Sequence, residues 1–149
     1  MSELKVNLNK VIKAPQEAVF NAWLNPQTIS KFMLPMPGMK APKVEVDAVK
    51  GGAFTIVMYG QEQEMLHKGE YLEITPSSRL VFTWESDFSP ASSTVTLEFS
   101  KIDEQTTNIE LTHLKFYSEE TRGQHEGGWG NILDTLLQVC EQKVEECAQ

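Results

Sequence analysis

The chain has 149 residues, of which 40% are hydrophobic and 23% are charged, a composition typical of a globular protein. Its formal net charge of −8 argues against nucleic acid or a membrane surface as a partner, because both need a basic patch. The length predicts a single domain over residues 1–149, and no apolar run is long enough for a membrane span.

The two cysteines and the N-terminal segment predict a cytoplasmic location. Cys140 and Cys147 are seven residues apart on one helical pattern, which places them about 10 Å apart along a helix axis. That distance is too long for a disulfide within the helix, so we interpret both as reduced thiols. The first residues also contain no apolar leader sequence.

The first part of the chain predicts a strand followed by two short helices. Apolar and polar residues alternate over residues 4–14, which indicates a strand. Pro15 suits the first position of a helix, and the apolar residues through Leu24 follow at helical spacing. Asn25 and Pro26 then fit the N-cap and the first turn of a second helix.

An apolar loop follows the second helix. Residues 33–39 contain three methionines, and two prolines and a glycine exclude regular structure there. Loops are usually polar, so this one should cover an apolar surface. It is either a flap over the core or the rim of an apolar pocket, a role that suits methionine because its side chain adapts to varied shapes.

Residues 43–114 predict a run of antiparallel strands. Short alternating segments are separated by turn signals at Gly51–Gly52, Gly60–Gln61, residues 76–78 and residues 103–105. Around Gly69 both faces carry apolar groups, so the orientation of this strand stays open, and a bulge fits there. Closely spaced strands with short turns indicate a meander with one apolar face.

The C-terminal part contains the most informative motif. Apolar residues recur with a period near 3.6 from Trp129 to Cys147, which predicts a helix that covers the sheet, and His125 extends the same stripe. Three glycines within residues 127–130 stand where this helix should begin, and they would cost roughly 3 kcal/mol if all were helical. We expect them to permit close packing on the sheet or to leave room for a ligand. Ser118 begins a helical segment of its own, with a break or kink at Gly123.

This layout resembles the helix-grip fold of the START/Bet v-like superfamily, also called SRPBCC. The resemblance rests on residues 14–23, 51–54, 69–84 and 125–136, and it covers essentially the whole chain. It is specific for the branch similar to the C-terminal domain of the activator of the heat-shock protein 90 ATPase. It implies an α+β fold: a curved antiparallel sheet of about seven strands wrapped around a long C-terminal helix, with two short helices after the first strand.

The resemblance also implies an apolar cavity between the sheet and the last helix, where ligands usually bind. We therefore predict a domain that binds an apolar or aromatic small molecule. Its predicted ligand-binding residues are Phe32, Met36, Phe54, Ile56, Met58, His67, Phe82, Trp84, Phe99, His113, His125, Trp129 and Leu133. The alternative is that these side chains simply fill a close-packed core.

Two other functions stay open. One is a co-chaperone-like or stress-response interaction module, with a chaperone or a second copy of the chain as its partner. The other is a cyclase or hydratase in which His125 or His67 acts as general acid or base, with Glu64, Glu126 or Tyr71 nearby. Three histidines could bind zinc, but no short ligand spacing supports a metal site, and no phosphate-loop motif is present. We expect no cofactor and assign no catalytic residue.

Overall fold

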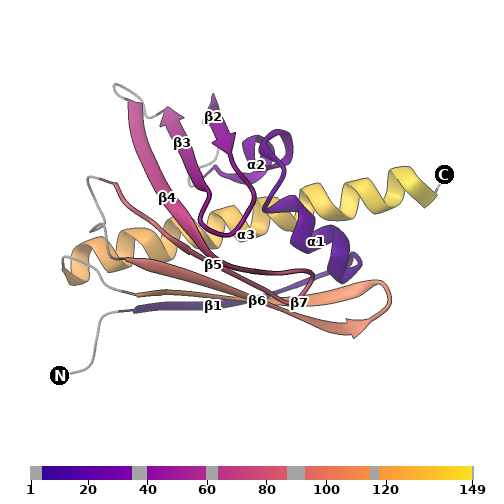
Figure 1. Cartoon of the computed structure of the whole chain (residues 1–149). Helices are drawn as coiled ribbons and strands as arrows, with labels where there is room; N and C mark the ends of the chain where they lie inside the picture. The colour runs from indigo at the N-terminus through magenta and orange to yellow at the C-terminus, as the bar shows by residue number, and fades with distance from the viewer. Residues whose placement is uncertain (1–4, 35–39, 60–63, 87–92, 115–117, 149) are drawn as a thin grey trace.

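The computed structural model describes residues 5–34, 40–59, 64–86, 93–114 and 118–148. Within them a seven-stranded sheet and three helices form the predicted α+β fold (Figure 1). The elements are β1 (Lys5–Ile12), α1 (Gln16–Ala22), α2 (Pro26–Phe32), β2 (Lys40–Val46), β3 (Ala53–Tyr59), β4 (Glu64–Thr75), β5 (Arg79–Thr83), β6 (Thr94–Asp103), β7 (Thr106–Leu114) and α3 (Glu119–Ala148).

The sheet has the order β1-β7-β6-β5-β4-β3-β2, and every neighbouring pair is antiparallel. Strands β2 to β7 thus form the predicted meander, and β1 is added at its far edge. Figure 1 shows the long helix α3 crossing one face of the bent sheet. Helix α2 contacts β2 and α3, whereas α1 contacts β6, β7 and α3. The helix-grip architecture is therefore confirmed.

Strand parity places the side chains as the alternation predicted. In β3, Phe54, Ile56 and Met58 are buried, and the residues between them are only partly buried. In β7, Ile109 and Leu111 are buried in the same way. Because successive side chains of a strand point to opposite faces, one face of the sheet becomes the apolar floor of the core.

Strand β4, whose orientation the sequence left open, turns His67 and Tyr71 toward the core and exposes Leu66 and Leu72. The pairing of β4 with β5 shifts register between Tyr71 and Glu73. The irregularity therefore lies a few residues beyond Gly69, the predicted place of a bulge.

Gly69 has a steric role instead. A Cβ atom at this position would lie 1.9 Å from the carbonyl oxygen of Thr83 and 2.7 Å from ring atoms of Phe54. Phe54 is also the cross-strand partner of Gly69 in the β3–β4 register. The missing side chain therefore lets the Phe54 ring and the backbone of the next strand approach β4 closely.

The predicted turns at Gly51–Gly52 and at residues 76–78 are confirmed. Gly51 has a φ of 83° and Ser77 a φ of 66°, the left-handed conformation that tight turns often require. Gly52 also lets the backbone carbonyl of Asp47 lie close to its own backbone, because a Cβ atom at Gly52 would lie 2.2 Å from the carbonyl oxygen of Asp47. The turn at Gly60–Gln61 and most of the methionine loop lie outside the described residues.

Local capping signals define the second short helix as predicted. The Oδ1 atom of Asn25 accepts hydrogen bonds from the backbone N–H groups of Gln27 (2.9 Å) and Thr28 (3.1 Å). Pro26 is the first helical residue. Pro15 differs slightly from the prediction, because it has extended backbone angles and caps α1 from outside instead of starting it.

Helix α3 is longer than predicted, because it runs without a break from Glu119 through all the glycines near its start. Ser118 does start it: its Oγ accepts from the Thr121 N–H at 3.3 Å, and Thr121 Oγ1 accepts from the Ser118 N–H at 3.1 Å. Of the predicted break or kink at Gly123, the break is wrong, because the helix is continuous there. Among the described residues, no helix has both the length and the apolar character needed to span a membrane.

One of the two predicted roles of the helix glycines, close packing on the sheet, is wrong for Gly127 and Gly130. A Cβ atom added at Gly123, Gly127 or Gly130 would meet nothing within 4 Å. These glycines therefore do not permit a close approach to the sheet. The apolar stripe of α3 makes that contact, and its buried members include Trp129, Leu133 and Leu136.

Candidate functional site

An apolar pocket lies where α2 and the C-terminal end of α1 cover strands β2 to β5. Its walls are Trp23, Ile29, Met33, Val46, Phe54, Ile56, Tyr71, Phe82 and Trp84. The cavity open to water-sized molecules measures about 20 Å³, whereas all empty space between the walls, including the opening to solvent, is about 290 Å³. The inner part thus has room for about one water molecule. A ring-sized ligand enters only if a wall side chain moves.

Four of the predicted ligand-binding residues belong to these walls: Phe54, Ile56, Phe82 and Trp84. All four were placed on the inner face of the sheet by strand alternation. Met36 lies outside the described residues. The remaining eight do not line this pocket, and they are Phe32, Met58, His67, Phe99, His113, His125, Trp129 and Leu133.

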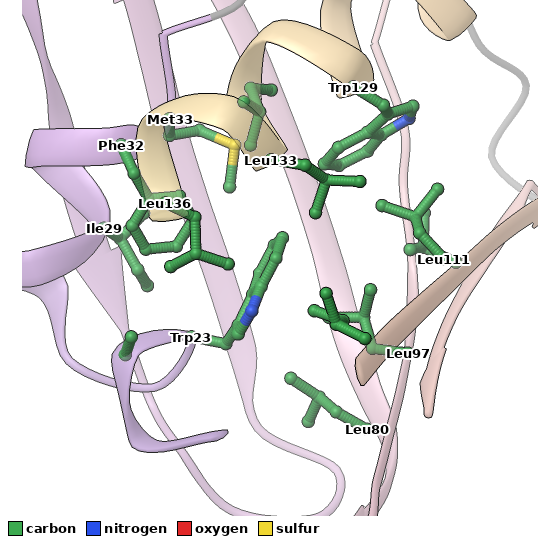
Figure 2. Close-up of a cluster of buried hydrophobic side chains, with 14 of the residues drawn as sticks. Trp23, Ile29, Phe32, Met33, Leu80, Leu97, Leu111, Trp129, Leu133 and Leu136 are labelled. Carbon is green, nitrogen blue, oxygen red and sulfur yellow. The ribbon is translucent and has the colours of Figure 1, made fainter. Parts of the chain in front are cut away.

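Most of these eight residues fill the core. Phe99, for example, packs edge-on against Phe20, with ring centroids 5.2 Å apart. Beneath α3 the side chains of Trp129, Leu133 and Leu136 pack against the sheet (Figure 2). The pocket therefore lies to one side of the long helix, between the short helices and the sheet, and not under α3.

Five wall residues were not among the predicted site residues: Trp23, Ile29, Met33, Val46 and Tyr71. Trp23 and Ile29 lie on the apolar faces of the short helices, a signal that the sequence contains but that equally fits the core. Figure 2 shows the Trp23 ring between side chains from α2, from α3 and from the sheet. Tyr71 has the same parity as His67 on β4, but the sequence suggested it only as a neighbour of a catalytic histidine and not as a wall.

The three tryptophans of the chain pack together next to the pocket, and two of them, Trp23 and Trp84, are among its walls. The ring centroid of Trp129 lies 4.9 Å from that of Trp84 and 6.5 Å from that of Trp23. The His67 ring also lies 4.9 Å from the Trp84 ring. Trp129 and His67 therefore pack behind the two tryptophans that line the pocket, and the ring faces of Trp23 and Trp84 favour planar apolar groups.

A buried chain of hydrogen bonds starts at Trp129. Its indole N–H donates to Nδ1 of His113 at 3.0 Å, and the Nε2–H of His113 then donates to Oγ of Ser93 at 3.1 Å. The Ser93 hydroxyl donates to the carbonyl oxygen of Trp84. The chain therefore connects α3 with β7 and with the segments that flank β5 and β6.

His113 is neutral in this chain. Burial, helped by the nearby His125, lowers the pKa of His113 to about 3. Because Nδ1 accepts from Trp129, the proton of the neutral ring is on Nε2, which matches its bond to Ser93. His113 is thus a structural connector at neutral pH and not a proton donor poised near pH 7.

Trp23 and Trp84 differ from Trp129. Each is only 3% exposed, and neither indole Nε1 has a hydrogen-bond partner among the described residues. Both side chains are walls of the pocket. Buried indole N–H groups normally find an acceptor, so two without one at a single pocket need an explanation.

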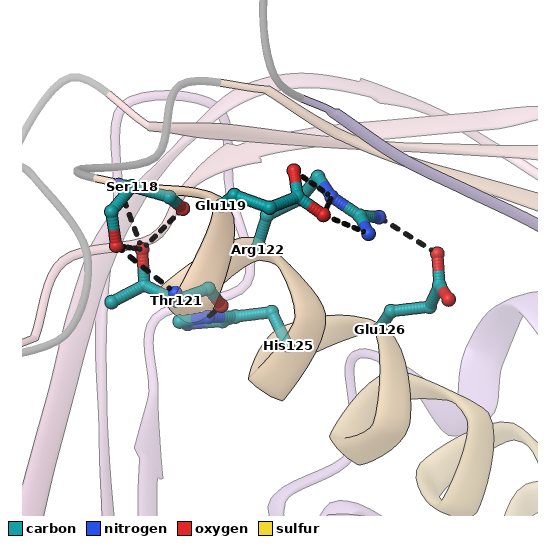
Figure 3. A network of polar contacts seen from close by, with 6 residues as sticks. All are labelled: Ser118, Glu119, Thr121, Arg122, His125 and Glu126. Atoms are coloured by element: carbon teal, nitrogen blue, oxygen red, sulfur yellow. Dashed lines mark hydrogen bonds and ion pairs between the residues drawn. The ribbon is translucent and has the colours of Figure 1, made fainter.

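The geometry gives the predicted acid–base role of His125 no support. The Nδ1–H of His125 donates to the Thr121 carbonyl oxygen at 2.7 Å, and burial lowers the pKa of the ring. The neighbouring Glu126 forms an ion pair with Arg122 at 2.8 Å (Figure 3). A carboxylate engaged in this way on the outer side of α3 does not reach the pocket.

The other residues of the acid–base hypothesis, Glu64, His67 and Tyr71, lie on β4. His67 Nδ1 lies 3.1 Å from the carbonyl oxygen of Met65, and Glu64 is exposed at the start of β4. Burial raises the pKa of Tyr71, which keeps its hydroxyl protonated. The described residues contain no group of three or more His, Cys, Asp or Glu side chains arranged to hold a metal ion.

Comparison with known proteins identifies relatives over nearly the whole chain. The model of the family described as "Activator of Hsp90 ATPase homolog 1-like protein" matches residues 13–141. No curated protein matches the sequence.

Several solved structures are similar. A Chromobacterium violaceum protein shares 25% identity at a TM-score of 0.82, covering 93% of this chain and 97% of its own. The AHSA1-like protein from Aeromonas hydrophila shares 24% identity at a TM-score of 0.79, with 93% of each chain covered. An HSP90 activator from Plasmodium falciparum shares 25% identity at 0.67, covering 85% of this chain and 87% of its own.

Proposed function

The chain belongs to the family of Activator of Hsp90 ATPase homolog 1-like proteins, and from that premise we propose that it is a small-molecule binding protein. Its ligand is an apolar or aromatic molecule with about one ring, held in the pocket between α2 and strands β2 to β5. The observation that carries the proposal is a partly open pocket whose nine walls are all apolar or aromatic side chains.

The walls suit such a ligand in shape as well as in polarity. Three aromatic rings lie next to one another on this part of the sheet and offer faces and edges to a ligand. The ring centroid of Phe54 lies 5.4 Å from that of Tyr71 and 6.1 Å from that of Trp84. Met33, at the end of α2, has three rotatable bonds and gives way more easily than a branched side chain. Rotation of Met33 therefore widens the narrow cavity without moving the backbone.

Titration with toluene, followed by NMR, tests this function. We expect saturable shifts of resonances from the walls, such as those of Ile29 and Ile56, and little change on the outer face of the sheet. Val46→Phe places a ring at the pocket rim and should weaken toluene binding at least tenfold. Val57→Phe is the matched control, because Val57 lies on β3 with the opposite parity and is no wall residue.

Two results would contradict the proposal. One is the absence of saturable shifts up to the solubility limit of toluene. The other is equal loss of binding in Val46→Phe and Val57→Phe, which would place the binding elsewhere. Native mass spectrometry of the purified protein adds an independent readout, because a ligand retained from the host would appear as a discrete added mass.

A chaperone partner is the second candidate function, supported by the family and by the similarity to the Plasmodium falciparum HSP90 activator. The outer face of β4 exposes Leu66 (52%) and Leu72 (43%), which adds apolar surface for a protein contact. An Hsp90 ATPase assay tests this candidate. Stimulation that is lost in a Leu66→Ser/Leu72→Ser variant supports it, and no stimulation at saturating protein rejects it.

A further inference from the structure

We infer that the ligand of this pocket carries an uncharged hydrogen-bond acceptor, a carbonyl-type oxygen, which the indole N–H groups of Trp23 and Trp84 hold. The inference deepens the proposed function and rests on it. It concerns the chemical class of the ligand, which the apolar walls alone do not specify.

The first argument is the contrast among the three tryptophans. All three are at least 97% buried, and an indole N–H can only donate a hydrogen bond. Trp129 has its acceptor in His113, whereas Trp23 and Trp84 have none among the described residues. An unpaired buried donor destabilises the folded protein, and both residues that carry one line the same pocket, so an acceptor atom from a bound ligand would complete them.

The second argument is that the surrounding groups cannot supply this acceptor. The Trp84 carbonyl oxygen already accepts from the Ser93 hydroxyl. Seven other residues line the pocket. Among them only Tyr71 carries a side-chain oxygen or nitrogen, and the sulfur of Met33 is only a weak acceptor. Donors therefore outnumber acceptors in this pocket, which is the polarity that a carbonyl oxygen requires.

The third argument concerns charge. None of the described walls carries a charged side chain, and burial raises the pKa of Tyr71, so its hydroxyl stays neutral. A carboxylate or phosphate would lose its hydration in this pocket without gaining a cation. A ketone, aldehyde, ester or amide attached to an apolar or aromatic body gains the two donors without that penalty.

Acetophenone and α-methylstyrene form a matched pair for the test, because they differ only in an oxygen replaced by a methylene group. The readout is the set of indole N–H cross-peaks in a ¹H–¹⁵N spectrum of the full chain. We expect acetophenone to bind about five- to tenfold more tightly, the ratio that one net buried hydrogen bond provides. It should move the Trp23 and Trp84 cross-peaks further than that of Trp129, whose N–H is already engaged.

Variants assign the effect to the donors. Trp84→Phe and Trp23→Phe keep an aromatic ring but remove the N–H, so each should reduce the preference for acetophenone while binding of α-methylstyrene persists. Trp129→Phe is the control that should keep the preference. A variant that fails to fold leaves the wild-type cross-peaks as the deciding measurement.

The outcomes separate this inference from the proposed function. Equal affinity for both compounds, with toluene also bound, overturns the acceptor inference and leaves the apolar pocket intact. Binding of neither compound, with toluene also unbound, overturns both. Indole cross-peaks that show contact with water and do not move with acetophenone mean that water is their acceptor, which also overturns the inference.

Discussion

The indole N–H of Trp129 in α3 donates a hydrogen bond to Nδ1 of His113 in β7 over 3.0 Å, and both side chains are buried. Apolar contacts between a helix and a sheet are non-directional, so they define the distance between the two better than the rotation of the helix. A hydrogen bond needs a specific angle as well as a distance. The apolar stripe selects the side of α3 that faces the sheet, and this contact defines the rotation of the helix more closely.

The first prediction tests that contact. Trp129→Phe retains an aromatic ring but removes the N–H, which leaves the Nδ1 atom of His113 without its donor. We expect the free energy of unfolding to fall by about 1–3 kcal/mol, from the unpaired acceptor alone, with a further loss from reduced packing. Urea unfolding followed by circular dichroism measures it.

A double-mutant cycle with His113→Leu separates these two losses. If the hydrogen bond matters, Trp129→Phe costs less in the His113→Leu background, by about 1 kcal/mol. Strict additivity of the two substitutions would show that the contact contributes nothing beyond packing.

The second prediction concerns pH. The pKa of His113 is about 3 in the folded protein, against 6.5 for an unperturbed histidine, because the ring is buried and near His125. Below pH 6.5 the unfolded chain therefore binds a proton at His113, whereas His113 in the folded protein stays unprotonated until the pH approaches 3. The stability present above pH 6.5 is lost as the pH falls toward 3, by up to about 1.4 kcal/mol per pH unit.

Urea unfolding at several pH values between 6.5 and 4 measures this slope. Burial lowers the pKa of His125 too, so its contribution has the same sign, and only a variant isolates His113. His113→Asn keeps an acceptor for Trp129 without a group that titrates in this range, so its slope should be visibly shallower. Equal slopes in the two proteins would assign the acid sensitivity to other groups.

The third prediction concerns two glycines with opposite surroundings. Gly127 lies inside α3, and a Cβ atom there would meet nothing within 4 Å. Gly127→Ala should therefore stabilise the protein by about 0.5–1 kcal/mol, because alanine loses less backbone entropy in a helix. Thermal unfolding should show a rise of about 2–4 °C per kcal/mol.

Gly69→Ala is the counterpart in β4. Its Cβ would lie 1.9 Å from the Thr83 carbonyl oxygen, so the backbone itself must move. We expect the free energy of unfolding to fall by about 3 kcal/mol or more, at the upper end of what overpacked core substitutions cost. A neutral Gly69→Ala variant would mean that β4 and β5 are less closely held than the structure shows.

The fourth prediction links a helix cap to the pocket. Asn25→Ala removes the side chain that accepts from the N–H groups of Gln27 and Thr28. We expect the free energy of unfolding to fall by about 1 kcal/mol and amide hydrogen exchange in α2 to become faster. The reason is that two backbone N–H groups in its first turn lose their acceptor. Toluene binding should weaken as well, since Ile29 and Met33 are pocket walls.

Asn21→Ala, an exposed substitution in α1, is the control for this cap. It should change neither the exchange rates in α2 nor toluene binding. If Asn25→Ala leaves α2 as protected as before, the short helix depends on its packing against β2 and α3 and not on its cap.

Much of the fold could be predicted because its signals are local. Asn25 and Pro26 define the start of α2 with capping chemistry that involves only neighbouring residues. Alternation places Phe54 and Ile56 on the inner face of β3, since side chains of a strand alternate regardless of what lies opposite. Ser118 marks the start of α3 in the same local way.

The failures come from features whose outcome depends on distant residues. The glycines of α3 predicted a late helix start, but the helix continues through them because burial of Trp129 and Leu133 outweighs their poor propensity. The face of β4 stayed open because apolar residues occur on both of its sides. The pocket beside α2 could not be placed from the sequence, because its position depends on the volume left between side chains from several elements.

The sequence by itself determined the order of the strands and helices, the apolar stripe of α3 and the inward direction of Trp84 and Trp129, because periodicity depends only on backbone geometry. Only the tertiary structure decided that the N–H of Trp129 meets His113, whereas Trp23 and Trp84 line an apolar pocket and their N–H groups have no acceptor among the described residues. A hydrogen bond requires donor and acceptor to align within about 3 Å. For residues far apart in the chain, that alignment exists only after the sheet and the helices have packed together.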